Sequence, residues 1–258
     1  VCVKQVLDTD MGFNIKDGQV DSEGIAPMMS TYDEIAVEEA IRIKESRPGT
    51  EITVMTLGPE NSRDVLQRGL EMGADQAVHL MDSAFTDLDH YGISRALAKA
   101  VQDIPYDLIL CGQQSVDEVM AHVGPALAVF LNIPCISFVT QLTLSENGKQ
   151  AEITRQTDEG SEILDTSLPL LITCHKKLNL PRFPNLKGVM EAKKKEVKVL
   201  DATAIGFDPD SMGSQTNRVR LVDLSLPPQR EKCLVLDGYD DETVSKLVKI
   251  LRHEKKIV

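Results

Sequence analysis

The sequence has no tryptophan, and aromatic residues make up only 4% of its 258 residues. Few rings are therefore available on which the bases of a nucleic acid could stack. Basic residues are also outnumbered, because 28 Lys and Arg residues stand against 40 Asp and Glu residues and leave a net charge of −12. This acidic balance argues against nucleic acid as a partner.

Long hydrophobic runs and close cysteine pairs are missing as well. No apolar run approaches the ~18 residues of a membrane span, so we expect no transmembrane segment, and no signal peptide is evident. The five cysteines are far apart and include no C-x-x-C pair. They predict buried thiols in a reducing compartment and no metal site. A hydrophobic content of 42% is typical of a soluble globular protein.

The first half of the chain alternates between strand and helix patterns. Strands are predicted at 1–6, 51–57, 77–80, 108–111 and 135–139, and helices at 32–44, 62–72, 90–101 and 118–131. This alternation, with short connections, predicts an α/β fold with a doubly wound, mainly parallel sheet. Ligands of such sheets bind beyond the carboxyl ends of the strands, here after Val6, Leu57 and Cys111.

The most informative segment is Asp107 to Pro125, DLILCGQQSVDEVMAHVGP, which has the pattern of a strand, a loop and a helix. A helix N-terminus presents unpaired backbone N–H groups and suits a phosphate. A second helix start is predicted at Ser30 to Asp33, because Thr31 and Glu34 have the spacing of a capping box. Together they predict a nucleotide site, although neither matches G-x-G-x-x-G or G-x-x-x-x-G-K-[ST], and an ordinary strand-to-helix turn remains the alternative.

The second half has a different pattern. Asn147-Gly148 predicts a hairpin, residues 168–173 return as a buried strand, and residues 176–236 look irregular before an amphipathic helix at 241–252. We therefore expect two regions. Residues 1–200 would form a nucleotide-binding α/β domain with a hairpin extension from about 141 to 174. Residues 201–258 would form an extended C-terminal arm whose amphipathic helix packs on a partner subunit.

Three classes of function fit a nucleotide site on this fold. An adenylating or ATP-hydrolysing enzyme would need a triphosphate loop and a pair of metal-binding carboxylates. The adjacent Asp117 and Glu118 would diverge on a helix and do not supply that pair. A nucleotide-sensing binding module would share the site and differ only in its partner. An electron carrier is the third class.

Eight blocks of the chain, in order, carry a resemblance to the beta subunit of electron transfer flavoprotein. They are VCVKQV at 1, YDEIAVEEAIRIKE at 32, TLGP at 56, GLEMGAD at 69, DLILCGQQSVD at 107, LPLLIT at 168, LNLPRF at 178 and EAKKK at 191. The resemblance implies an adenine nucleotide alpha hydrolase-like fold and a heterodimer with an alpha subunit that carries a further FAD. It also implies an electron carrier without catalytic residues of its own, in the bacterial cytoplasm or the mitochondrial matrix.

The resemblance further implies an adenine nucleotide in the site described above. This is AMP in the simple electron carriers and a second FAD in the flavin-bifurcating kind. Val123-Gly124-Pro125 resembles the second kind and favours FAD, and we expect Gly124 to leave room for the longer ligand. The cofactor contacts implied are Cys2, Ser30, Thr31, Tyr32, Asp33, Leu57, Gly112, Gln113, Gln114, Ser115, Val116, Asp117, Glu118, Val119, Met120, Ala121, His122 and Val123.

A separate contact is implied for the dehydrogenase, of the acyl-CoA type, that exchanges electrons with the family. The segment from Leu178 to Met190 resembles the family's recognition loop, and its exposed leucine corresponds to Leu186. An apolar anchor in a polar loop is a plausible hot spot for partner binding. The alternative is that Leu186 packs on its own loop.

Overall fold

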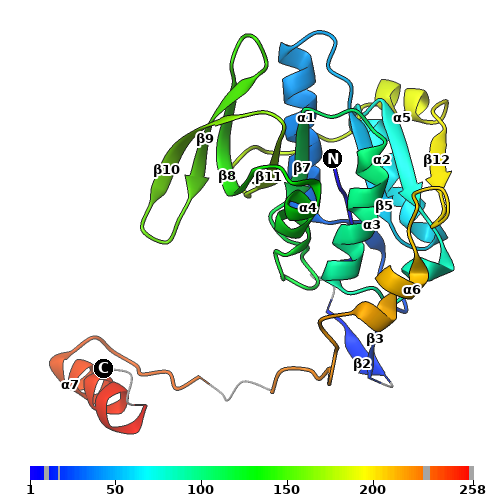
Figure 1. The fold of residues 1–258 in the computed structure, drawn as a ribbon. Coiled ribbons are helices and arrows are strands. Elements are labelled where there is room, and N and C mark those ends of the chain that lie inside the picture. The colour runs from blue at the N-terminus through cyan, green and yellow to red at the C-terminus, as the bar shows by residue number, and fades with distance from the viewer. Residues whose placement is uncertain (9–11, 17, 229–232, 256–258) are drawn as a thin grey trace. The chain divides into compact units, whose positions relative to one another are not determined.

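The structure is a computed structural model that describes residues 1–8, 12–16, 18–228 and 233–255. Contacts within the chain divide it into two compact units, Val1–Leu224 and Ser225–Val258. The first unit contains the sheet and the buried core (Figure 1). No helix in the described ranges is long and apolar enough to cross a membrane.

The sheet of the first unit has two parts, one wholly parallel and one mixed. One part has the order β12, β6, β5, with all three strands parallel, and the other has the order β10, β9, β8, β11, β7. Strands β8, β11 and β7 are parallel, whereas β9 and β10 extend the sheet as antiparallel hairpin strands. The bounds are β5 (Thr53–Leu57), β6 (Gln76–Leu80), β7 (Leu108–Gly112), β8 (Cys135–Leu144), β9 (Gln150–Gln156), β10 (Ser161–Ser167), β11 (Leu170–Cys174) and β12 (Val197–Leu200).

The first residues of the chain connect these two parts. Cys2 pairs in parallel with Met55 of β5 on one side and with Cys111 of β7 on the other. The Cys2 N–H donates to the Leu110 carbonyl oxygen at 3.0 Å, and the Val3 N–H donates to the Met55 carbonyl oxygen at 2.9 Å. The carboxyl ends of β5 and β7 therefore lie on either side of residues 1–4, which precede β1 and are called the first strand below, as the predicted fold requires.

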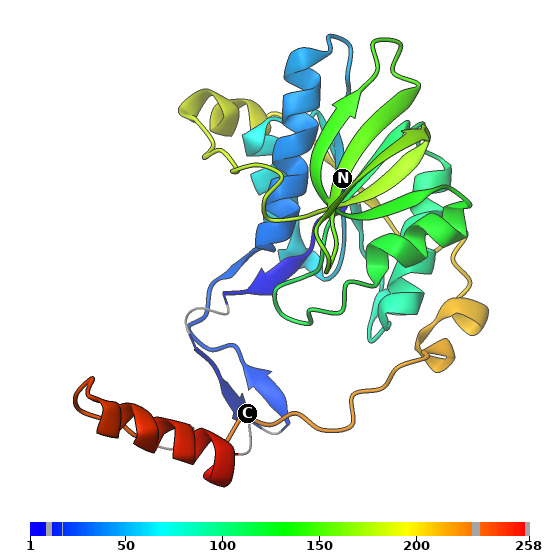
Figure 2. The same ribbon diagram turned by 90° about the vertical axis from the view of Figure 1, so that its left-hand side faces the viewer.

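Helices cover both faces of the sheet (Figure 2). One face carries α1 (Thr31–Ser46), α2 (Arg63–Met72) and α5 (Leu186–Ala192), and the other carries α3 (His90–Gln102) and α4 (Val123–Leu131). Apolar residues at helical spacing explain this burial. In α2, for example, Val65, Leu66 and Leu70 are almost fully buried. The doubly wound α/β fold with a mainly parallel sheet is confirmed.

Short elements surround this layer. A small antiparallel pair joins β1 (Gln5–Leu7) to β4 (Pro27–Met29), and the hairpin of β2 (Asn14–Lys16) and β3 (Gln19–Asp21) lies between them in sequence. The strand predicted at residues 1–6 is therefore divided, because residues 1–3 pair in the central sheet while Gln5 onward pairs with β4.

Two helix starts differ from the prediction. Helix α4 begins at Val123 rather than at Glu118, because Val119 and Ala121 have φ angles of 57° and 51° in the left-handed region, which a right-handed helix cannot include. Helix α1 begins at Thr31, one residue before its predicted bound, and the predicted capping box is wrong. Ser30 occupies the N-cap position without a side-chain hydrogen bond, and Glu34 binds Arg68 at 3.1 Å instead.

The segment predicted to be irregular contains real structure. Helix α5 and strand β12 lie within it, and the chain then forms α6 (Pro209–Met212). Ile205 and Phe207 are buried in the core, where the Phe207 ring meets the Phe85 ring edge-on at 5.2 Å. The boundary expected at residue 201 therefore falls after Leu224, because these side chains anchor the segment to the first unit.

The described residues of the second unit contain one helical segment. Helix α7 (Asp241–Lys249) is capped by Asp240, whose side chain accepts a hydrogen bond from the Thr243 N–H, and it continues as a π-helical turn, Ile250–Glu254. The apolar residues of α7, Val244, Leu247 and Val248, are largely exposed within the chain. Residues 229–232 and 256–258 of the expected arm lie outside the described residues.

Candidate functional site

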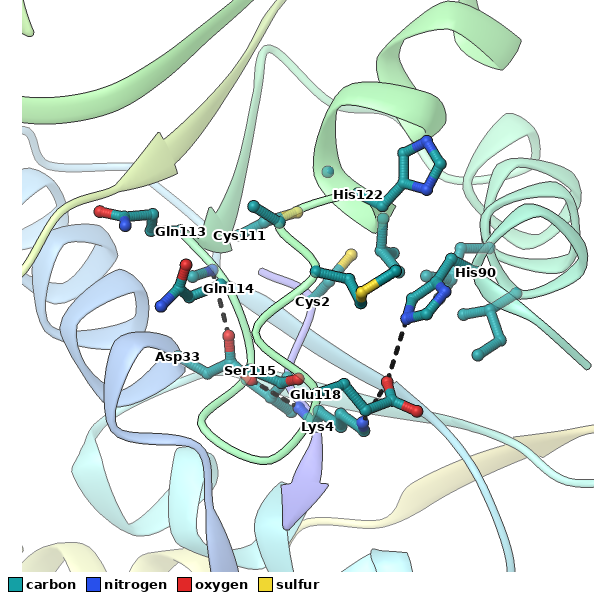
Figure 3. Close-up of a pocket in the computed structure, with 18 of the residues that line it drawn as sticks. Cys2, Lys4, Asp33, His90, Cys111, Gln113, Gln114, Ser115, Glu118 and His122 are labelled. Atoms are coloured by element: carbon teal, nitrogen blue, oxygen red, sulfur yellow. Dashed lines mark hydrogen bonds and ion pairs between the residues drawn. The ribbon is translucent and has the colours of Figure 1, made fainter. Parts of the chain in front are cut away.

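A pocket opens beyond the carboxyl ends of β5, the first strand and β7 (Figure 3). Its apolar wall comes from β5 and α3, and its other side comes from the segment that connects β7 to α4. Cys2, Asp33, Cys111 and Gly112 form the floor of the pocket. The segment 113–122 forms its rim, from which Gln113, Gln114, Ser115, Glu118, Met120, Ala121 and His122 line the pocket. The other lining residues are Val3, Lys4, Met55, Leu57, His90, Ile93, Leu97, Val123 and Gly124.

Asp33 fastens three elements of the floor together. Its carboxylate accepts a hydrogen bond from the Lys4 backbone N–H at 2.8 Å and one from the Gly112 N–H at 3.1 Å. These bonds join helix α1 to the first strand and to the end of β7. Burial raises the pKa of Asp33 to about 7, although both hydrogen bonds oppose the shift. Asp33 is therefore a buried group that titrates near neutral pH.

Gly112 allows α1 to approach the end of β7. A Cβ atom on Gly112 would lie 2.8 Å from the Tyr32 Cβ and would collide with the Asp33 carboxylate. Gly124 plays a similar part on the other face of the sheet, because a Cβ there would lie 2.9 Å from Thr173 Cγ2. We expected the missing side chain of Gly124 to leave room for a longer ligand. This reason is wrong, because the space that a Cβ atom would occupy lies against Thr173 of β11.

The rim is held by ion pairs near the surface. The Lys4 Nζ atom lies 2.9 Å from Asp117 Oδ2 and 2.9 Å from Glu118 Oε2, and the His90 Nε2 atom lies 3.1 Å from Glu118 Oε2. Burial alone would lower the pKa of Lys4, but the hydrogen bonds to both carboxylates raise it above its ordinary value. Lys4 thus holds the rim over the pocket.

Two residues that line the pocket each carry a buried polar atom without a hydrogen-bond partner in the described part of the chain. Gln113 Oε1 and His90 Nδ1 are both buried without a hydrogen bond among the described residues. Buried polar groups almost always have a partner, so these atoms are suited to a ligand. Together with the apolar wall of Leu57, Ile93 and other side chains, they fit a nucleotide, which presents an aromatic base and polar ribose and phosphate groups.

The structure gathers most of the predicted cofactor contacts around this pocket. Those that line it are Cys2, Asp33, Leu57, Gly112, Gln113, Gln114, Ser115, Glu118, Met120, Ala121, His122 and Val123. Those that are not among its lining residues are Ser30, Thr31, Tyr32, Val116, Asp117 and Val119. Tyr32 instead packs against one of the two cores, and Asp117 binds Lys4. Leu186, the predicted partner contact, lies elsewhere, at the start of α5.

Sequence reasoning missed the contribution of α3. His90, Ile93 and Leu97 line the pocket from a helix that is distant in sequence from the other contacts. Lys4 was also missed, although the spacing of VCVKQV puts it two residues after Cys2. One signal in the sequence could have identified His90 as a site residue. It is a polar residue at the first position of a predicted helix, next to the edge of the sheet. In the described part of the chain, no group of three or more His, Cys, Asp or Glu side chains could hold a metal ion.

The fold and the pocket define a class: a doubly wound α/β protein with a ligand site at the carboxyl ends of its strands. Comparison with known proteins narrows this class. A model of the electron transfer flavoprotein domain matches residues 17–205.

Full-length relatives agree. An electron transfer flavoprotein subunit beta from Bacillus subtilis (strain 168) is 36% identical over 100% of this chain and 98% of its own length. The corresponding subunit from Sus scrofa is 34% identical over 100% of this chain and 97% of its own length. A caffeyl-CoA reductase-Etf complex subunit CarD from Acetobacterium woodii is 33% identical over 100% of this chain and 98% of its own length. The chain therefore belongs to the electron transfer flavoprotein beta-subunit family, and the resemblance noted in the sequence is confirmed.

Proposed function

We propose that this chain works as one subunit of a heterodimeric electron carrier that binds an adenine nucleotide in the pocket described above. The partner would be an electron transfer flavoprotein alpha subunit, which carries a further FAD. The carrier would pass electrons between a dehydrogenase and further acceptors. In this proposal the beta chain binds and orients groups and performs no substrate chemistry itself.

The observation that carries the nucleotide proposal is that two features occur at the same pocket. Residues implied by family resemblance, such as Cys2, Leu57 and Gln114, lie around one pocket. Gln113 and His90, which also line that pocket, carry the buried unpartnered atoms Oε1 and Nδ1. We assign the adenine to the apolar wall and the phosphate to the first turn of α4, whose backbone N–H groups have no side-chain cap.

We further propose FAD rather than AMP as the nucleotide of this pocket. Met120 and Ala121 line the rim without offering a polar side chain to close over a single phosphate. His90 and His122, whose ring centroids are 6.1 Å apart, lie beside them. The His90 Nε2 atom already binds Glu118, but the His122 ring is exposed, and its N–H can donate to a second phosphate, which FAD has and AMP lacks. A flavin held here would supply redox chemistry, so the complex would be suited to flavin-based electron bifurcation.

The nucleotide content of the purified complex tests this proposal. The protein is denatured, and the released nucleotides are separated and quantified by absorbance per mole of complex. Two FAD per heterodimer are expected. One FAD and one AMP would overturn the FAD assignment while keeping the site, and release of no nucleotide beyond one FAD would overturn the nucleotide site itself.

For the dehydrogenase, we propose a docking surface around Leu186. This residue is 76% exposed at the start of α5, where Asn185 caps the helix by accepting from the Gly188 N–H at 2.8 Å. Leu180 and Phe183, just before it, are even more exposed. Because Leu186 lies on a capped helix rather than in the irregular loop that the sequence indicated, its position is preorganised for binding.

Exchange of electrons with an acyl-CoA dehydrogenase tests this surface. Leu186→Ala should weaken docking roughly thirtyfold, since loss of an interface anchor costs about 2 kcal/mol, with no change in melting temperature. Val129→Ala is the matched control, because Val129 is equally exposed on α4, on the opposite face of the sheet. Equal effects of the two variants on electron transfer would exclude Leu186 as the anchor.

We propose that the amphipathic helix α7 packs on the partner subunit. Its apolar side chains, Val244, Leu247 and Val248, are 42% to 52% exposed within the described chain. Burial of such a face against another subunit would stabilise it by about 25 cal/mol for each Å² removed from water. Removal of residues 225–258 should therefore abolish co-purification of an alpha subunit while the first unit stays folded. Retained co-purification would exclude this role.

A further inference from the structure

Two cysteines lie side by side in the floor of the pocket, and neither the family nor the nucleotide proposal gives them a role as a pair. Cys2 and Cys111 are direct partners in the parallel pairing of the first strand with β7. Both side chains line the pocket (Figure 3). Neighbouring strands are about 4.8 Å apart. This separation falls within the range of Cα distances, roughly 4.4 to 6.8 Å, that a disulfide bridges.

We propose that Cys2 and Cys111 form a redox-active dithiol, which a peroxide converts to a disulfide across the floor of the pocket. Paired side chains of neighbouring strands stand on the same face of a sheet, so the two sulfur atoms meet without a change of strand register. Cys2 is partly exposed whereas Cys111 is buried, which makes Cys2 the thiol that a small oxidant from the pocket reaches first.

The electrostatics of the pair support this order. The side-chain hydrogen bond from Cys111 lowers the pKa of Cys2 to about 7, although burial opposes the shift. The same hydrogen bond and burial raise the pKa of Cys111 well above its ordinary value. Cys2 is therefore largely a thiolate slightly above neutral pH, and the thiolate is the nucleophilic form of cysteine.

The reaction balances with a peroxide as the only oxidant. The Cys2 thiolate attacks one oxygen of hydrogen peroxide, the O–O bond breaks, and the other oxygen leaves as water after taking up a proton. The resulting Cys2 sulfenic acid is attacked by the Cys111 sulfur, which loses its proton, and a second water leaves. The two thiols together lose two electrons and two protons, and the peroxide is reduced to two molecules of water.

The other cysteines provide internal comparisons. Cys174 is fully buried, and burial raises the pKa of its thiol well above the ordinary value, so it should stay reduced. Cys135 is partly exposed, and burial raises the pKa of its thiol. Cys233 is exposed and could form disulfides between molecules. The experiment therefore uses the full chain with Cys233→Ser.

This variant is treated with hydrogen peroxide in small stoichiometric steps. Remaining thiols are then blocked by alkylation, and a non-reducing digest is analysed by mass spectrometry. The expected result is a peptide that links Cys2 to Cys111, the loss of two free thiols per chain, and full recovery on reduction with dithiothreitol. The wild-type chain is treated in the same way, and oxidation of its exposed Cys233 shows that the peroxide concentration is sufficient. Absence of the Cys2–Cys111 peptide at that concentration would overturn the proposal.

Matched variants assign the chemistry. Cys111→Ser should abolish the linked peptide and leave a Cys2 sulfenic acid that dimedone traps, whereas Cys135→Ser should retain the cross-link in full. A cross-link from Cys2 to Cys135 would overturn the pairing. Because the digest of the parent chain detects the disulfide directly, the proposal stays falsifiable even where a serine variant fails to fold.

Discussion

The floor and the rim of the pocket are built in contrasting ways. The floor is held by a buried carboxylate that accepts two backbone hydrogen bonds, and by a glycine that lets α1 approach β7. The rim is held by exposed ion pairs from Lys4, and it includes two residues in left-handed backbone conformations. Buried hydrogen bonds to charged groups contribute more to stability than exposed ion pairs do. The floor should therefore be rigid, and the rim should open more easily.

The largest effect is expected where the floor is most tightly packed. Gly112→Val should lower the free energy of unfolding by about 3 kcal/mol, because the new side chain collides with Asp33 and Tyr32 rather than with a ligand. Urea denaturation of the full chain measures this loss. Gln114→Val is the control, since it puts the same side chain in the rim, and it should change stability by less than about 0.5 kcal/mol.

Equal losses in these two variants would remove the distinction between floor and rim. The result also bears on the cofactor, because displacement of α1 should lower nucleotide content in Gly112→Val. A variant with normal stability and no nucleotide would show that Gly112 faces the ligand after all.

The second prediction concerns the titration of Asp33. Its pKa of about 7 in the folded chain lies above the ordinary value of 3.8, so the folded state holds a proton that the unfolded state has released. The contribution of Asp33 to stability is then present at low pH and is lost as the pH rises through 7. Between pH 6 and pH 8 the loss amounts to about 1.4 kcal/mol, because the folded state binds about half a proton on average over these two pH units.

The stability difference between Cys2→Ser and Cys2→Ser with Asp33→Asn isolates this contribution, because Cys2 titrates in the same window and its charge interacts with Asp33. The difference should shrink by that amount from pH 6 to pH 8. Asp117→Asn serves as the control. Burial would raise the pKa of Asp117, but hydrogen bonds from Ser115 and Lys4 lower it, so no change is expected above pH 6. A constant difference for Asp33→Asn would contradict the raised pKa.

The same contrast explains which parts of the molecule were predictable from sequence. The floor and the sheet follow from local patterns, such as the apolar run that ends at Gly112, so the strands and most helices lie within a few residues of their predicted bounds. The rim was misjudged because Val119 fits the helical periodicity of α4. Its positive φ is uncommon for a β-branched residue, and no sequence pattern reveals it.

Two further differences have their own causes. Helix α5 and strand β12 were missed because each is too short to show a period, and they are ordered by packing on α2 and β6. His90 was missed as a site residue because α3 reaches the pocket only through tertiary folding. Most of the predicted contacts that follow β7 line the pocket, whereas Thr31 and Tyr32 do not. The start of their helix packs against Gly112 below the pocket instead.

The smallest effect on stability is expected in the rim. Lys4→Met removes both ion pairs, but the Lys4 side chain is 38% exposed, so solvent screens the interaction and the loss should stay near 0.5 kcal/mol. Local opening should respond more strongly. Without Lys4, amide hydrogen exchange of residues 113–122 should become severalfold faster, while the amide of Gly112, which donates to Asp33, should keep its exchange rate. Lys187→Met, which removes the exposed pair with Glu191 in α5, is the control and should leave both rates unchanged. A loss of stability above about 2 kcal/mol, or equal acceleration at Gly112, would show that Lys4 holds the whole pocket together rather than the rim alone.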